Sequence, residues 1–131
     1  MRLLLDTHIW LWSMLEPTRL SRRVAKALED PRNELWLSPV SVWEVLVLSE
    51  KGRIDLRENV ESWVAKAMAV APLWEAPFTH DVALATQTIR LPHRDPADRF
   101  LAATAKVYDL TLVTADENLS RSKDFAVLRN G

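Results

Sequence analysis

The stretch RLLLDTH at residues 2–8 has the form of a short buried strand that ends on an acidic residue. Its apolar part, residues 3–5, is followed at once by Asp6, so it is too short for a secretory signal or a membrane span. A second stretch of this form, LVTAD at residues 112–116, ends on Asp116. Between the two, short apolar runs alternate with longer helical patterns, which predicts an α/β protein with a parallel sheet.

The boundaries of the predicted elements follow from hydrophobic periodicity, proline positions and helix caps. We predict strands over residues 3–5, 35–37, 73–75, 110–114 and 126–128. Helices are predicted over about residues 8–15, 22–28, 39–50, 58–70, 79–91 and 96–108, with a helical turn at 117–119. No repeat, low-complexity segment or long linker divides the sequence, so we expect one domain over residues 1–131.

The composition excludes several kinds of functional site. Two glycines, Gly52 and Gly131, are too few for a glycine-rich phosphate-binding loop. The lack of cysteine excludes disulfides, zinc–thiolate sites and cysteine nucleophiles. A net charge of -1 argues against a protein that coats nucleic acid, although an acidic nuclease site would offset basic residues elsewhere. No segment is apolar for long enough to span a membrane, and we expect a cytoplasmic protein.

Glu44 is the acidic residue that a structural role explains least well. It lies inside VWEVLVL at residues 42–48, which is otherwise apolar. Ser38 followed by Pro39 is a better helix start than Ser41, which places Glu44 one turn into the helix, where no backbone amide needs a cap. A carboxylate in this setting is costly unless it is paired or bound to a metal ion.

Three other acids have a structural explanation as well as a functional one. Asp6 and Asp116 could cap the helical segments that follow them, and Asp98 lies in the first turn of a helix for which Asp95 is the expected N-cap. However, Asp6, Glu44 and Asp116 each follow the carboxyl end of a predicted strand, and in a parallel sheet these ends share one edge. Carboxylates gathered there repel one another unless a cation lies between them, and an all-oxygen ligand set predicts Mg²⁺ or Mn²⁺.

Four segments of the chain, taken together, resemble the PIN-domain ribonucleases and in detail the VapC-type toxins of toxin–antitoxin pairs. The segments are LLDTH at residues 4–8, SPVSVWE at 38–44, HRDPADR at 93–99 and LVTAD at 112–116. The resemblance covers nearly the whole chain and implies a three-layer α/β/α fold around a mainly parallel sheet of four to five strands. By similarity, Asp6, Glu44, Asp98 and Asp116 match the metal-coordinating acids, Asp95 an accessory acid, and Thr114 a hydroxyl near the last one.

The resemblance implies hydrolysis of RNA phosphodiester bonds with one or two Mg²⁺ or Mn²⁺ ions and no side-chain nucleophile. Partners would be RNA, a small cognate antitoxin that covers the acidic site, and a second copy of the chain in a homodimer. His8 and His93 lie in helix-entry segments, and we favour a structural role for both. Among the basic residues, Arg94 and Arg99 lie near the acids in sequence and are candidates for phosphate binding. Other basic clusters lie at residues 19–26 and 51–57.

Two alternatives remain open from the sequence. An aspartate-dependent phosphatase would use Asp6 as a nucleophile, but such enzymes typically have an acid two residues later, where this chain has His8. A non-catalytic PIN-like module that binds RNA or protein is disfavoured by the full set of acids. The identity of the RNA, the number of ions and the antitoxin are not determined by the sequence.

The six tryptophans are unusual for 131 residues. We expect Trp36, Trp43 and Trp63 in the core. The segment that contains Trp10 and Trp12 is apolar on nearly all sides, which predicts that part of it is buried at a subunit interface.

Overall fold

The computed structural model describes residues 1–92 and 95–131 and contains one five-stranded parallel sheet in the order β3-β2-β1-β4-β5. The strands are β1 (Arg2–Leu5), β2 (Glu34–Leu37), β3 (Trp74–Glu75), β4 (Thr111–Thr114) and β5 (Val127–Arg129). The helices are α1 (Thr7–Leu15), α2 (Arg22–Glu29), α3 (Pro39–Glu50), α4 (Val60–Val70), α5 (His80–Ala85), α6 (Pro96–Tyr108) and α7 (Glu117–Ser120). Two short 3-10 helices, η1 (Pro17–Arg19) and η2 (Thr86–Thr88), complete the described elements. The predicted parallel α/β architecture is confirmed.

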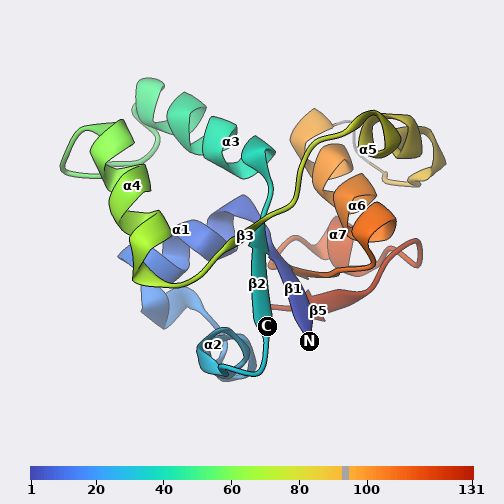
Figure 1. The fold of residues 1–131 in the computed structure, drawn as a ribbon, viewed down its shortest axis with the longest axis horizontal. Coiled ribbons are helices and arrows are strands. Elements are labelled where there is room, and N and C mark those ends of the chain that lie inside the picture. The colour runs from blue at the N-terminus through green and yellow to red at the C-terminus, as the bar shows by residue number, and fades with distance from the viewer. Residues whose placement is uncertain (93–94) are drawn as a thin grey trace.

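Helices cover both faces of the sheet because the side chains of its central strands alternate between two apolar cores. Leu3 and Leu5 of β1 belong to the core under α1, α2, α3 and α4, whereas Leu4 belongs to the core under α5, α6 and α7. The same alternation separates Val113 from Leu112 in β4. Figure 1 shows the resulting three layers, with α1, α2 and α4 on one side of the sheet and α5, α6 and α7 on the other.

The register of the central strands brings their carboxyl ends to one edge. Leu5 pairs with Val113, and the amide of Asp6 donates to the carbonyl of Val113 at 3.0 Å. Next to β1, strand β2 ends at Leu37, and Ser38 then caps α3 by accepting a hydrogen bond from the Val40 amide. Thus Asp6, the start of α3 and the end of β4 lie close together, and Figure 1 shows α3 and α6 at this end of the sheet.

The tryptophans follow the prediction only in part. Trp63 is buried as expected, and the expectation that Trp43 lies in the core is wrong, because its side chain is 57% exposed. Ser41 and Val45 are the buried positions of α3. Trp43 is two residues from each of them, which places it on the opposite, exposed side of the helix. Trp10 lies in the core of its own chain, with its ring centroid 5.3 Å from that of Trp63 in an edge-to-face arrangement.

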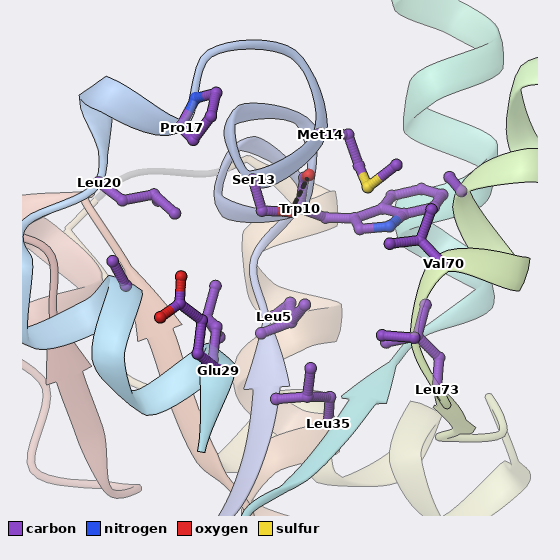
Figure 2. Close-up of a pocket in the computed structure, with 14 residues that line it drawn as sticks. Leu5, Trp10, Ser13, Met14, Pro17, Leu20, Glu29, Leu35, Val70 and Leu73 are labelled. Carbon is purple, nitrogen blue, oxygen red and sulfur yellow. Dashed lines mark hydrogen bonds between the residues drawn. The ribbon is translucent and has the colours of Figure 1, made fainter. Parts of the chain in front are cut away.

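An apolar pocket of about 240 Å³ lies between α1, η1, α2 and α4 (Figure 2). Leu5, Trp10, Met14 and Leu20 are among its lining residues, and Glu29 is its one acidic lining residue among the described residues. No helix within the described part of the chain is long and apolar enough to cross a membrane.

Candidate active site

Acidic side chains from α3, from α6 and from the positions that precede α1, α6 and α7 line a second pocket, of about 450 Å³, at the carboxyl end of the sheet. The lining residues of this acidic pocket are Asp6, His8, Trp12, Arg19, Glu44, Asp95, Asp98, Ala115 and Asp116. All four acids predicted as the active centre are therefore brought together, together with the accessory Asp95. The apolar pocket has no comparable set of reactive groups, so the acidic pocket is the candidate active site.

Asp6 occupies the position before α1 but does not act as its cap. Its carboxylate makes no capping hydrogen bond to α1 and instead accepts one from Thr114 Oγ1 at 2.7 Å. Only 7% of the residue is exposed. Burial raises the pKa of Asp6, and this effect outweighs the hydrogen bond from Thr114, which favours the charged form. The capping explanation left open by the sequence thus fails for Asp6.

Glu44 is oriented by a hydroxyl from the neighbouring helix. Thr7 is fully buried, and its Oγ1 donates to Glu44 Oε1 at 2.5 Å. Burial raises the pKa of Glu44, and the nearby charge of Asp6 adds to the increase. Glu44 is partly buried, and its carboxylate is paired with the Thr7 hydroxyl.

Asp98 experiences the charges of all the other acids in the pocket. It lies in the first turn of α6 and is partly buried. Burial, followed by repulsion from Asp6, Asp95, Asp116 and Glu44, raises its pKa to about 8. Repulsion of this kind shows that the carboxylates share one electrostatic site rather than separate solvated surfaces.

Asp116 and Asp95 both line the pocket and cap helices. Asp116 Oδ1 accepts from the amides of Asn118 and Leu119 at 2.8 and 3.1 Å. Asp95 Oδ1 accepts from the amide of Ala97 at 3.0 Å, as predicted for an N-cap. The capping bonds use one carboxylate oxygen of each residue, so capping does not by itself exclude a role in the pocket.

The donor chemistry of the acidic pocket fits a hard divalent cation, because every acidic lining side chain offers oxygen. Across residues 1–92 and 95–131, however, no three His, Asp or Glu side chains are already gathered as one metal-binding group. Mg²⁺ commonly keeps several waters and uses only one or two carboxylates directly, so such an ion does not require a preformed protein cage. After burial, repulsion from neighbouring acids contributes to the raised pKa values of Asp6, Glu44 and Asp98, and a cation bound between them would relieve that repulsion.

Arg99, one of the two arginines predicted to bind phosphate, is not among the described residues that line the pocket. The Arg99 guanidinium donates to the carbonyls of Thr86 and Ile89, at 3.3 and 2.7 Å, and thereby ties α6 to the segment around η2. Arg94, like His93, lies outside the described residues. Instead, Arg19 contributes a cation to the lining, together with Trp12 and His8. The sequence signals for this part of the site were the basic cluster at residues 19–26, which was ranked below Arg94 and Arg99, and the four-residue spacing of His8 and Trp12 on one helix.

Thr114 links two of the acids by hydrogen bonds: its hydroxyl donates to the Asp6 carboxylate and accepts from the Asp116 amide at 3.0 Å. Substitution of Thr114 therefore tests whether this link matters for catalysis. We expect Thr114→Val to slow RNA cleavage by about 10- to 100-fold, as supporting groups of metal ligands do when removed. It should also cost about 1–3 kcal/mol of stability, since Asp6 loses a buried hydrogen bond and the Asp116 amide loses a partly buried one. Cleavage rates and thermal unfolding would measure the two effects.

Thr104→Val is the matched control, because Thr104 is equally buried and its hydroxyl donates to the Phe100 carbonyl within its own helix α6. Equal cleavage by the two variants would contradict the role assigned to Thr114.

Comparisons with known proteins agree with this site and fold. A PIN domain model matches residues 3–124. Ribonuclease VapC22 of Mycobacterium tuberculosis is 36% identical over 120 residues, which cover 88% of each chain. The DNA-bound VapBC structure from Salmonella typhimurium has a TM-score of 0.74 at 16% identity and covers 100% of this chain and 99% of that one. VapBC-5 from Mycobacterium tuberculosis, a member of the VapBC family of toxin-antitoxin systems, has a TM-score of 0.63 at 16% identity and 98% coverage of both chains. The chain therefore belongs to the PIN-domain family.

Proposed function

We propose that this chain is an endoribonuclease that hydrolyses RNA phosphodiester bonds with Mg²⁺ or Mn²⁺ bound in the acidic pocket. The observation that carries the proposal is the convergence of Asp6, Glu44, Asp98 and Asp116 on one pocket at the carboxyl edge of a parallel sheet. Ligand sites of open α/β sheets lie at this edge. The 36% identity to a ribonuclease over most of the chain supports the same reaction class.

The four acids would hold the metal and position the reacting groups. When bound, the cation would polarise the scissile phosphate and lower the pKa of an attacking water. Thr7 holds Glu44 in place and Thr114 holds Asp6, so two buried hydroxyls restrict the carboxylates that face the pocket. Such restraint reduces the reorganisation needed when substrate binds. The reaction requires no nucleophile from the protein.

We further propose that the chain is the toxin of a toxin–antitoxin pair and is inhibited by a small antitoxin protein. The similarity to a VapC ribonuclease and the structural likeness to VapBC systems support this assignment. An antitoxin segment that carries basic residues would complement the acidic pocket and exclude RNA from it. We also expect a homodimer and a cytoplasmic location.

The metal requirement has a direct test. We expect cleavage of a labelled RNA in Mg²⁺ or Mn²⁺ to fall to background when a chelator is added, and to return when excess metal is restored. The reason is that the ionised carboxylates lining the pocket repel the phosphate of RNA unless a cation lies between them. The measurement is the initial rate by gel electrophoresis across a metal titration.

Asp6→Asn and Asp109→Asn provide the paired variants for this assay. Asp109 is exposed and follows α6 with a left-handed backbone, a conformation that Asn tolerates. The metal mechanism would be contradicted if cleavage continued in the presence of the chelator, or if Asp6→Asn cleaved RNA at the native rate. RNA binding with no cleavage in any metal would support the non-catalytic alternative.

A further inference from the structure

Arg19 provides a positive charge at the wall of the otherwise acidic pocket. Its guanidinium carbon lies 4.2 Å from the centroid of the Trp12 ring. Trp12 in turn lies beside His8, with ring centroids 5.9 Å apart. All three residues line the pocket that contains the acids. The wall formed by His8, Trp12 and Arg19 thus places an imidazole, an indole and a guanidinium next to the acids of the candidate active site.

The backbone of Arg19 is held at both of its polar groups. Its amide donates to the Glu16 carbonyl at 3.0 Å, and its carbonyl accepts from Asn130 Nδ2 at 3.1 Å. Asn130 also accepts a hydrogen bond from the amide of Ser21 through Oδ1. A residue 111 positions away in sequence therefore fixes the end of η1, where Arg19 lies.

The Arg19 side chain is oriented without being neutralised by a strong ion pair. Its ion pair with Glu16 spans 3.5 Å between side chains that are 55% and 58% exposed, and contacts of this kind contribute little. Stacking on Trp12 covers one face of the guanidinium but leaves its N–H edge available. That edge matches the oxygens of a phosphate group, to which arginine can donate two parallel hydrogen bonds.

We propose that Arg19, held over Trp12, is the residue that binds a backbone phosphate of the RNA as it enters the acidic pocket. The inference rests on the proposed nuclease function and adds to it a residue that positions the RNA. Arg99 competes poorly for this role because its guanidinium is bound to two main-chain carbonyls. A phosphate held at the pocket wall would place the next phosphate of the strand near the acids, whose charges would otherwise repel it.

RNA binding measured without cleavage tests the proposal directly. On an Asp98→Asn background in Mg²⁺, fluorescence anisotropy with a short single-stranded RNA should show that Arg19→Ala weakens binding by about tenfold. The slope of log affinity against log salt should fall in magnitude by about 0.7, the change expected for one lost phosphate contact. Arg19→Lys should restore the slope but only part of the affinity, because lysine keeps the charge and loses the planar fork.

Two further variants complete the design. Trp12→Leu should also weaken RNA binding. The double variant Trp12→Leu/Arg19→Ala should bind little more weakly than Arg19→Ala alone, since each substitution removes the same contact between the indole and the guanidinium. Arg22→Ala is the matched control, because Arg22 is an exposed arginine nearby that does not line the acidic pocket. In chains that retain Asp98, Arg19→Ala should raise KM for RNA about tenfold and leave kcat within twofold.

The possible outcomes separate this inference from the proposed function. Equal affinity and salt slope for Arg19→Ala and Arg22→Ala, or no measurable RNA binding by the parent, would overturn the role of Arg19. If that occurs while Asp98→Asn still abolishes cleavage, the nuclease assignment stands and only Arg19 is wrongly placed. If the parent protein never cleaves RNA but Arg19→Ala weakens binding and lowers the slope, the phosphate contact is supported and the nuclease mechanism is not.

Discussion

Asp98→Asn is expected to slow RNA cleavage by about 1,000-fold while making the metal-free protein more stable at neutral and alkaline pH. The loss in rate follows because a cation held by carboxylates contributes several kcal/mol to the stabilisation of transition-state charge, and about 1.4 kcal/mol corresponds to a factor of ten. The gain in stability follows because Asn removes a carboxylate whose charged form is disfavoured first by burial and then by repulsion from the other acids of the pocket.

The pH dependence of stability has a defined direction. The pKa of Asp98 is raised from 3.8 to about 8 in the folded chain, so the folded state holds this proton more tightly than the unfolded state. The resulting stabilisation is complete below about pH 4 and is lost as the pH rises towards 8. Thermal unfolding of the chelated protein should therefore show a midpoint that falls over this range. The fall should be smaller in Asp98→Asn, and Asp6 and Glu44, whose pKa values are also raised, should account for what remains.

Added Mg²⁺ should reverse the fall in midpoint, with the largest increase at the highest pH, because ligands must be deprotonated to bind metal. Asp109→Asn serves again as the control for a lost surface carboxylate. A midpoint that rises with pH in the chelated protein, or an Asp98→Asn protein that cleaves at the native rate, would contradict the shared acidic site.

Trp10→Ala is expected to lower the free energy of unfolding by about 3–5 kcal/mol, the usual cost of removing a buried aromatic side chain. Trp10 is 2% exposed and packs edge-to-face on Trp63 in the core shared by α1 and α4. Its removal would also open the apolar pocket towards the core, since Trp10 lines that pocket (Figure 2). Chemical denaturation at several protein concentrations would measure the loss.

Trp43→Ala is the matched variant, because Trp43 is 57% exposed and its removal should cost less than about 1 kcal/mol. The concentration series distinguishes two origins of the Trp10 effect. A loss independent of concentration agrees with a core residue of the single chain. A loss that appears only at concentrations where subunits associate would instead support burial at a subunit interface, as the apolar character of this segment first indicated.

The sequence determined the architecture because strand and helix periodicities are local properties. Short apolar runs separated by helical patterns require crossover connections, and these force the strands to lie parallel with their carboxyl ends at one edge. An acid placed after such a strand must then lie at that edge. For this reason Asp6, Glu44 and Asp116 could be assigned to one site before any coordinates, with Asp98 added through the family resemblance.

Only the tertiary structure decided which groups face each acid. Asp6, Asp95 and Asp116 all had the sequence context of helix caps, yet Asp95 and Asp116 cap helices whereas Asp6 accepts from Thr114, which is 108 residues away. Sequence proximity suggested Arg99 as a phosphate ligand, but the packing of α6 against η2 directs its guanidinium to carbonyl groups. Arg19 is brought to the acids at the end of η1, which Asn130 fixes from the far end of the chain. Hydrophobic periodicity predicts which face of a helix or strand is buried. The residues that contact this face belong to other elements, and which residues these are depends on how the elements pack.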